Sequence, residues 1–360
     1  MTPQSNSQFS HLREYIRIAR EKANEGHLSV PRQITEMILL YLCRGLGPRY
    51  YLFGRFWRRE IPLGKKLRHL NEKDYVRQIA KLNSPQYQKC SQHKVAEKAI
   101  LSLFGIPTPR FFGHIQNLTG RSCHGDPLRT AEDLAALLER ERPTRICFKL
   151  VEGWSGTGFE AAEIDYNGSP PALIPLPTGS RTDIGDYLDI RLKMESCPQG
   201  RIIEEYCRQD PWYQSLNPTS LNTLRIYAIL QPSGPARILG GYLRIGRKGS
   251  LIDNASKGGI LFPFDPKSGT LKLGHFNTID TSFYKCHPDS GIQIEGCKLP
   301  KWDEALELVR KALEIFPNIR FAGLDIAVTE DGPTVIELNV QPDRNAACNI
   351  DLPTLDMLTP

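Results

Sequence analysis

The sequence predicts an α+β fold, with strands and helices in both halves of the chain. The clearest observation is a β-hairpin near the C-terminus, in residues 321–344. Directly before it, residues 302–316 have the apolar spacing of an amphipathic helix. Short apolar runs elsewhere read as further strands, at 146–150, 201–207, 222–230 and 239–245. Strands and helices mixed in this order are typical of an α+β protein.

The predicted hairpin carries three oxygen-bearing side chains that can meet. Apolar residues alternate along 324–328, the segment 330–333 predicts a tight turn, and Glu337 and Asn339 then share one face of the second strand. Asp325 lies on the partner strand, so pairing can bring the three together. Two carboxylates and an amide oxygen suit Mg²⁺, which often shares its shell with nucleotide phosphates. Taken alone, the pattern also fits a solvated hairpin with its polar residues outward.

Composition and length place the chain among ordinary globular proteins. It has 360 residues, of which 40% are hydrophobic and 24% are charged. No apolar run approaches the length of a membrane span, and the N-terminus lacks the apolar core of a secretory signal. Nine cysteines without a C-x-x-C pair fit reduced, mostly buried thiols. We therefore expect a cytoplasmic protein with no membrane span.

The segment 44–68 is strongly basic and rich in aromatic residues. It holds eight Arg or Lys against Glu60 alone, a balance of +7, where the whole chain has +6. Such a patch could meet nucleic acid, anionic lipid headgroups or an acidic sugar. We favour a helical subdomain with inward aromatic residues and solvated arginines. The same basic balance suggests that one substrate is acidic, and we expect no nucleic-acid partner.

Most of the remaining helices lie before the middle of the chain. Thr130 offers an N-cap and is followed by acids in the first turn of a helix, which complement the helix dipole. Gly26, Gly45 and Gly105 close earlier helical patterns. The segments expected to be helical are 12–26, 31–45, 71–82, 94–104, 130–143 and 182–194.

A glycine-rich segment follows the predicted strand 146–150. Lys149 lies near the end of that strand, and Gly153, Gly156 and Gly158 come within the next residues. A backbone of this kind can approach phosphates closely, and a lysine beside it supplies a point charge. The order differs from the P-loop, in which the lysine follows the glycines. A purely structural turn explains the glycines equally well when they are considered alone.

Six segments in order resemble the ATP-grasp superfamily, over about residues 94–343. They are a lysine-led helix ending in GIPTP, FKLVEGWSGTGF, IIEEY, NTLRI, DNASKGGI and GLDI…VIELN. The segment NPTSLNTLRIYAIL and the helical N-terminal region are similar to the sugar-transfer-associated branch, described as related to α-L-glutamate ligases. The resemblance implies two α+β subdomains that clasp ATP, preceded by a mainly helical region. The boundaries expected are 1–88 for the basic helical region, 89–205 for the first subdomain and 206–360 for the second.

The resemblance also implies roles for individual residues. Lys94 and Lys149 would hold the nucleotide phosphates, and Arg225 and Arg244 would meet the γ-phosphate and an acylphosphate, with Arg225, Arg244 and Lys149 serving catalysis. Asp325, Glu337 and Asn339 would be the magnesium ligands. The other residues that the resemblance assigns to nucleotide binding are Gly153, Ser155, Gly156, Thr157 and Gly158 in the loop over the triphosphate, Glu204, Glu205, Tyr206 and Cys207 in the hinge at adenine, Asp210 at the ribose, and Asn254.

The implied reaction joins a carboxylate to an amine, using ATP and Mg²⁺ and passing through an acylphosphate. Phosphotransfer to a hydroxyl on the same fold is an alternative, because the same ATP-binding groups serve both reactions. A non-catalytic protein that binds an anionic polymer through 44–68 is a third reading. The expected partners are small carboxylate and amine substrates, and a homodimer is the commonest assembly.

Overall fold

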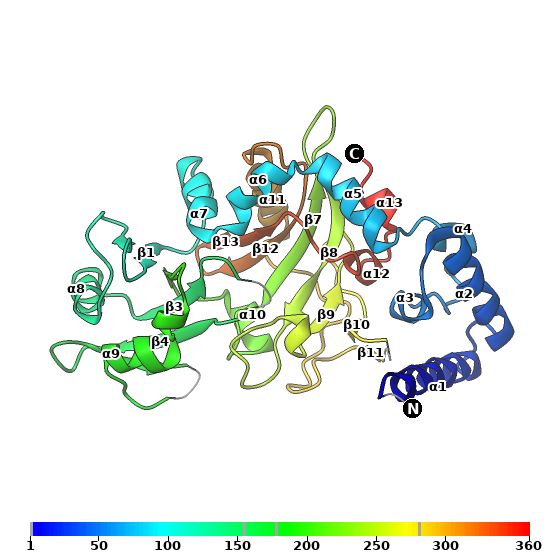
Figure 1. Ribbon diagram of the computed structural model, residues 1–360, viewed down its shortest axis with the longest axis horizontal. Helices are drawn as coiled ribbons and strands as arrows, with labels where there is room; N and C mark the ends of the chain where they lie inside the picture. The colour runs from blue at the N-terminus through cyan, green and yellow to red at the C-terminus, as the bar shows by residue number, and fades with distance from the viewer. Residues whose placement is uncertain (1–2, 154–155, 177–178, 280–281) are drawn as a thin grey trace.

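Two antiparallel sheets organise the chain in this computed structural model, which describes residues 3–153, 156–176, 179–279 and 282–360 (Figure 1). The smaller sheet has six strands in the order β2-β1-β6-β3-β4-β5. All its strand pairs are antiparallel. Its strands are β1 (Phe111–Ile115), β2 (Arg121–Ser122), β3 (Arg145–Leu150), β4 (Glu160–Asp165), β5 (Ala172–Pro175) and β6 (Arg201–Glu205).

The larger sheet has seven strands in the order β11-β10-β9-β8-β7-β12-β13, again all antiparallel. It contains the predicted hairpin, which is confirmed: β12 and β13 pair with Asp325 opposite Glu337 and Gly323 opposite Asn339. Its strands are β7 (Thr223–Ile229), β8 (Arg237–Ile245), β9 (Ile260–Pro263), β10 (Gly274–Phe276), β11 (Phe283–Tyr284), β12 (Phe321–Thr329) and β13 (Gly332–Asn339).

The helices surround these sheets and form the N-terminal region. The structure gives them as α1 (Pro3–Asn24), α2 (Val30–Arg44), α3 (Pro48–Phe53), α4 (Leu63–Lys66), α5 (Glu72–Leu82), α6 (Pro85–Gln92), α7 (Lys94–Leu103), α8 (Ala131–Glu141), α9 (Ile184–Asp186), α10 (Pro211–Leu216), α11 (Trp302–Glu314), α12 (Ala346–Asn349) and α13 (Thr354–Met357). The α+β prediction is therefore confirmed.

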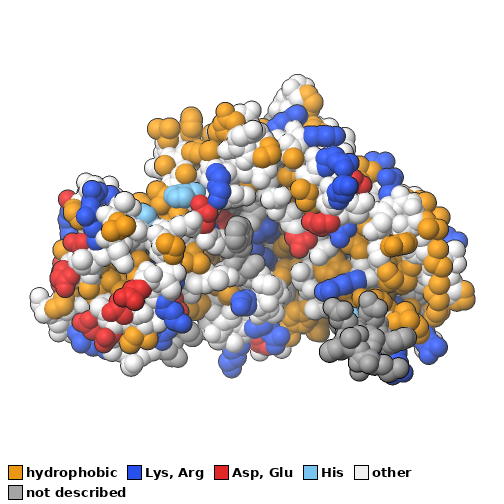
Figure 2. Space-filling model, viewed as in Figure 1, with side chains coloured by type: hydrophobic (Ala, Val, Ile, Leu, Met, Phe, Trp, Pro, Cys, Tyr) orange, Lys and Arg blue, Asp and Glu red, His pale blue; other side chains and the backbone are white. Residues whose placement is uncertain are grey.

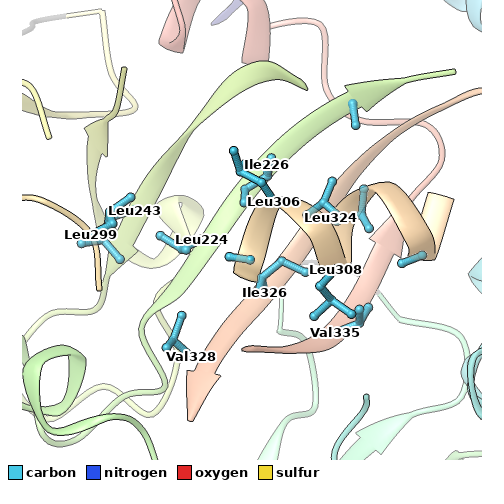
Figure 3. Packing of buried hydrophobic residues seen from close by; sticks show 14 of the residues in the cluster. Leu224, Ile226, Leu243, Leu299, Leu306, Leu308, Leu324, Ile326, Val328 and Val335 are labelled. Atoms are coloured by element: carbon cyan, nitrogen blue, oxygen red, sulfur yellow. The ribbon is translucent and has the colours of Figure 1, made fainter. Parts of the chain in front are cut away.

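The main core lies between α11 and one face of the larger sheet (Figure 3). Leu306 and Leu308 of α11 are buried with Ile226 of β7, Leu324 of β12 and Val335 of β13. This packing holds β7, β12 and β13 together, so the side chains on their opposite face are fixed in place. The core also takes in Leu101 and Ile106 from α7 and its following loop. The predicted domain boundaries, which group these two residues with the smaller sheet, stay a prediction.

The prediction of one continuous helix over 182–194 is wrong. The segment is divided into α9, a π-helical turn at Tyr187–Arg191 and a 3-10 turn at Met194–Ser196. Lys193 has a left-handed backbone with φ of 50°. The Arg201 guanidinium donates a hydrogen bond to the Leu192 carbonyl at 2.7 Å. A helix cannot continue where a carbonyl is drawn to a side chain and the backbone reverses hand.

The aromatic residues of 44–68 face inward, as the favoured interpretation expected. Tyr50, Tyr51, Phe53, Phe56 and Trp57 are all buried in one cluster. That cluster also contains Cys348, from the C-terminal end of the chain. The N-terminal region therefore packs against the segment that follows β13.

Many of the basic side chains of 44–68 have partners within the chain, and fewer are solvated than expected. Arg58 forms an ion pair with Asp351, and Arg68 contacts Asp356 with Nε 2.8 Å from Oδ1. Arg55 is buried and donates to the carbonyl of Cys348. These three arginines contact the C-terminal segment. Much of the positive charge of 44–68 therefore helps to attach the N-terminal region to the rest of the chain.

Truncating Trp57 should show how much this anchoring contributes. Trp57 is 1% exposed, and Trp57→Ala is expected to lower the free energy of unfolding by about 3–5 kcal/mol, because it leaves a cavity. Urea denaturation checks this, with Tyr41→Ala as a control at a side chain that is 63% exposed. The control should change stability by no more than about 0.5 kcal/mol. Equal losses in the two variants would contradict the packing described here.

The exposed surface of α2 carries an apolar stripe, visible at the right of Figure 2. It consists of Ile34, Ile38, Tyr41 and Leu42. All four side chains are exposed. Among the described residues, no helix is both long and apolar enough to cross a bilayer. All nine cysteines are free, but only Cys147 and Cys348 are buried, so the expectation of mostly buried thiols is wrong.

Candidate nucleotide and metal site

A pocket of about 910 Å³, its open mouth included, lies between the two sheets. The smaller sheet contributes Lys149 from β3, and the larger sheet contributes Arg244, Asp325 and Glu337 from β8, β12 and β13. The predicted site residues that line it are Lys94, Lys149, Gly153, Gly156, Thr157, Glu205, Tyr206, Cys207, Arg244, Asn254, Asp325 and Glu337. One cavity thus gathers residues from segments that are far apart in the sequence.

Some predicted site residues lie elsewhere. Gly158, Glu204, Asp210, Arg225 and Asn339 are not part of this pocket lining. Arg225 and Asn339 line a second cavity beside it. Ser155 lies outside the described residues.

Lys149 is held by a buried carboxylate on the neighbouring strand. Its Nζ donates to Glu204 Oε2 at 2.6 Å, and Lys98 Nζ from α7 lies 2.7 Å from Glu204 Oε1. β3 and β6 are adjacent, with Cys147 opposite Glu204. The side chain of Glu204 is buried and contacts both lysines, and the role expected for its backbone, in the hinge at adenine, stays a prediction.

The charges in this cluster stabilise one another's ionised forms. Burial alone would raise the pKa of Glu204, but Lys149 and Lys98 outweigh it and the pKa is lowered. Burial would likewise lower the pKa of Lys149, but Glu204 outweighs it and the pKa is raised. Both groups are therefore ionised at neutral pH, and two cations share one anion. The surplus positive charge faces a pocket suited to phosphate.

The hinge offers backbone groups to a flat ligand. The N–H groups of Glu205 and Tyr206 bond to the carbonyls of Arg110 and Arg145, at 2.9 and 3.1 Å. The N–H of Cys207 makes no hydrogen bond within the described part of the chain, and Cys207 lines the pocket. An unpaired backbone donor at the pocket wall can meet a ring nitrogen of a base.

The cysteines in the pocket wall have raised pKa values. Burial raises the pKa of Cys207 to about 11 and that of Cys147 to about 12. Each is a thiol at neutral pH, and the thiolate is the nucleophilic form. This fits chemistry that needs no cysteine nucleophile.

Described residues of the glycine loop, Gly153, Gly156 and Thr157, line one side of the pocket. Gly156 has a φ of +70°, and a Cβ there would lie 2.8 Å from Ile252 Cδ1. Gly158 has a φ of +66°, and its carbonyl accepts a hydrogen bond from Arg201. Glycine is favoured at both positions, because other residues rarely adopt this backbone conformation.

The three predicted magnesium ligands lie on paired strands, as the register requires. Asn339 Nδ2 donates to Glu337 Oε1 at 3.3 Å, so these two side chains are neighbours. Lys94 Nζ lies 3.7 Å from Glu337 Oε2. Asp325 is opposite Glu337 in the sheet. Two carboxylates and an amide oxygen fit Mg²⁺ by donor type, although no group of three or more His, Cys, Asp or Glu that could hold a metal occurs among the described residues.

Two arginines hold the carboxylate of Asp325. Arg225 contacts both oxygens, with Nη2 2.9 Å from Oδ2, and Arg244 Nη2 lies 2.8 Å from the same Oδ2. Burial would raise the pKa of Asp325, but the two guanidinium groups outweigh it and the pKa is lowered. Asp325 is therefore ionised and already has cationic partners.

These ion pairs predict how the site takes up metal. A divalent ion must compete with two guanidinium groups for Asp325, so the free protein should bind Mn²⁺ weakly. Adding AMP-PNP should raise the affinity for Mn²⁺ at least tenfold, because phosphate oxygens then supply further ligands. Electron paramagnetic resonance of free Mn²⁺ measures both titrations. Equal Mn²⁺ affinity with and without the nucleotide would contradict the competition.

A substitution separates this competition from a simple lack of ligands. Arg225→Met removes one partner of Asp325, and we expect it to strengthen Mn²⁺ binding in the absence of nucleotide. Arg237→Met is a matched control, because Arg237 is an exposed arginine at the start of β8 that contacts the carbonyl of Thr359. It should leave Mn²⁺ affinity unchanged.

Asp210, the candidate for the ribose, is outside the pocket lining, and its expected role stays a prediction. Asp210 is the N-cap of α10, where its Oδ1 accepts from Trp212 N at 3.0 Å. Its other oxygen lies 3.9 Å from Lys301 Nζ. An Asp followed by Pro is a frequent start of a helix, and this signal was present in the sequence.

Two buried residues of α7 were missed by sequence reasoning. Lys98 is one turn after Lys94 on the same helix, and this spacing indicates that both can face one site. Glu97 is 1% exposed, and its Oε1 accepts from Leu338 N at 2.7 Å. Glu97 therefore fixes β13 between Glu337 and Asn339. Asn254, which was predicted, lines the pocket and caps a short turn by accepting from Ser256 N.

The two antiparallel sheets, with lysines, glycines and strand-borne carboxylates around the pocket between them, are consistent with an ATP-grasp protein. Residues 73–351 match the family described as sugar-transfer associated ATP-grasp, and the chain belongs to that family. The comparison with curated proteins gave no match.

Solved structures with a similar fold are distant. One is the carboxyaminoimidazole ribonucleotide synthase from Aspergillus clavatus complexed with ATP, with 14% identity, a TM-score of 0.41, and coverage of 76% of this chain and 55% of that one. Another is the L-amino acid ligase from Bacillus licheniformis, with 12% identity, a TM-score of 0.37, and coverage of 72% of this chain and 43% of that one. A third is the D-alanyl-alanine synthetase A from Vibrio cholerae O1 biovar eltor str. N16961, with 11% identity, a TM-score of 0.38, and coverage of 71% of this chain and 57% of that one. The chain spans about half the length of these proteins.

Proposed function

We propose that the protein is an ATP- and Mg²⁺-dependent ligase that joins a carboxylate to an amine. The observation that carries this proposal is the pocket between the sheets. It combines a surplus of lysine charge, a glycine loop and two carboxylates on adjacent strands. Family membership supports the same conclusion.

Each group has a task in the proposed reaction. Lys149 and Lys94 neutralise the triphosphate, and the Cys207 N–H meets the base. Asp325, Glu337 and Asn339 would hold Mg²⁺, which supplies charge neutralisation at the phosphate oxygens. Catalysis then rests on positioning and electrostatic stabilisation by groups that are already in place.

The bond changes balance without a protein nucleophile. A carboxylate oxygen attacks the γ-phosphorus, and ADP leaves. The amine nitrogen then attacks the acyl carbon, phosphate leaves, and the nitrogen loses a proton to solvent. Arg244 lines both cavities and Arg225 lines the second one, so they can stabilise the negative charge that passes between phosphate and acyl group.

The first test is nucleotide binding by isothermal titration. The protein should bind AMP-PNP with Mg²⁺, and Lys149→Met should weaken binding at least tenfold. The second test is the mass of products after incubation with ATP, Mg²⁺ and mixtures of carboxylates and amines. A ligase product has the mass of both substrates less water, whereas a phosphotransferase product carries an added phosphate. Absence of AMP-PNP binding would overturn the proposal.

A further inference from the structure

A second cavity lies directly beside the nucleotide pocket. The two share five wall residues: Lys94, Gly153, Arg244, Asn254 and Glu337. Lys94 and Glu337 are also the residues proposed to meet the triphosphate and its metal. A molecule in the second cavity would therefore lie against the reacting end of ATP.

Three cationic side chains line this cavity. They are Lys94, Arg225 and Arg244. Both arginines bind Asp325 through Nε or Nη2, and the Nη1 groups of both make no hydrogen bond among the described residues. A guanidinium with free N–H groups is well suited to a carboxylate. The two arginines are therefore suited to the carboxylate of a substrate.

The rest of the wall includes uncharged polar groups. They are the amides of Gln92, Asn277 and Gln341 and the hydroxyl of Ser256, and Glu337 and Asp343 are the acidic residues of the wall. Within the described residues, the side chains of Gln92 and Gln341 make no hydrogen bond, whereas Asn277 Oδ1 accepts from Asn349 Nδ2 at 3.0 Å. An amide both donates and accepts, as a hydroxyl does. The free amides of Gln92 and Gln341 therefore match a ligand that carries hydroxyl groups.

The N-terminal region holds this wall in place. Tyr75 Oη donates to the Pro342 carbonyl at 3.0 Å, and Asn83 Nδ2 donates to the Val340 carbonyl at 2.6 Å. Arg344 Nη1 donates to the carbonyl of Leu70 at 3.0 Å. The backbone around Gln341 is thus fixed on both sides by residues that precede the two sheets, so the cavity has a defined shape.

We propose that the second cavity binds the carboxylate substrate and selects one that carries hydroxyl groups along its chain. The carboxylate lies against Arg225 and Arg244, and the hydroxyls face Gln92 and Gln341. This inference rests on the proposed function, because it requires ATP in the neighbouring pocket. Selection follows because a ligand without hydroxyls would leave the amides without partners after displacing water.

Three six-carbon probes test the inference on protein loaded with AMP-PNP and Mg²⁺. D-gluconate has a carboxylate and hydroxyls, hexanoate has only the carboxylate, and D-sorbitol has only hydroxyls. Isothermal titration or ligand-observed NMR should find that gluconate binds at least tenfold more tightly than either of the others. Gluconate that binds no better than hexanoate would overturn the inference while AMP-PNP binding still supports the proposed function. Failure of AMP-PNP to bind would overturn both.

Variants then locate the probe. Gln341→Leu and Gln92→Leu keep side-chain size and remove the amide, so each should weaken gluconate binding about threefold to tenfold. Gln86→Leu is the control, because Gln86 is exposed on α6 outside the cavity lining. AMP-PNP affinity should be unchanged in all three variants. Unchanged gluconate affinity in both cavity variants would place the probe elsewhere and contradict the inference.

Discussion

Replacing Glu337 with Gln is expected to lower Mg²⁺-dependent ATP turnover by about 10²–10³-fold while the protein stays folded. The amide keeps the shape of the side chain but loses the negative charge beside Asn339 and Lys94. Glu337 is partly exposed in the wall of both cavities, so the fold does not depend on it. Steady-state ADP release at varied Mg²⁺ measures the loss, and thermal unfolding checks the fold.

Glu330→Gln is the matched control for this experiment. Glu330 is exposed beyond the end of β12, in the turn of the same hairpin. The Glu330→Gln substitution removes the same negative charge, but at a position outside the lining of the nucleotide pocket. Turnover near the wild-type rate in Glu337→Gln, or an equal loss in Glu330→Gln, would remove the metal assignment.

Glu204→Gln is expected to lower the free energy of unfolding by about 3–5 kcal/mol. The change leaves Lys149 and Lys98 close to each other without the carboxylate that both contact. Removing one partner of a buried ion pair has a cost of this size, because a charge is left uncompensated. Urea denaturation at neutral pH measures it. Glu205→Gln, one residue later and exposed, should change stability by no more than about 0.5 kcal/mol.

The stability that Glu204 contributes should depend on pH in a defined direction. Its pKa is lowered in the folded protein, so the contribution is present above the unfolded value, about 4.3. It is lost as the pH falls through the folded pKa. The pKa of Lys149 is raised, so its contribution is present below about 10.4 and is lost only at higher pH. The difference between wild type and Glu204→Gln should be constant from pH 6 to 8 and should shrink in acid.

Local patterns in the sequence were sufficient to predict the hairpin and the strand pairing of the three proposed magnesium ligands. The side-chain period of a strand places Glu337 and Asn339 together, and the turn at 330–333 then sets Asp325 opposite Glu337. A short-range rule decides each of these features. The same holds for the glycine loop after Lys149, since strand and loop adjoin in the chain.

Long-range pairings could not be predicted in this way. Glu204 is 55 residues from Lys149, and nothing local indicates that it neutralises this lysine. Asp351 is 293 residues from Arg58, so the basic segment could be read as a surface for an anionic partner. The ion pairs of Arg225 and Arg244 with Asp325 likewise depend on the order of the strands in the sheet. In each case the partner is determined by tertiary packing.

The most direct test of the account is a crystal structure with AMP-PNP and Mg²⁺. The account predicts the base at the backbone of Cys207 and the phosphates beside Lys149 and the glycine loop. It also predicts Mg²⁺ about 2.0–2.1 Å from oxygens of the 325, 337 and 339 side chains. Nucleotide bound outside the pocket between the sheets, or metal held without Glu337, would contradict it.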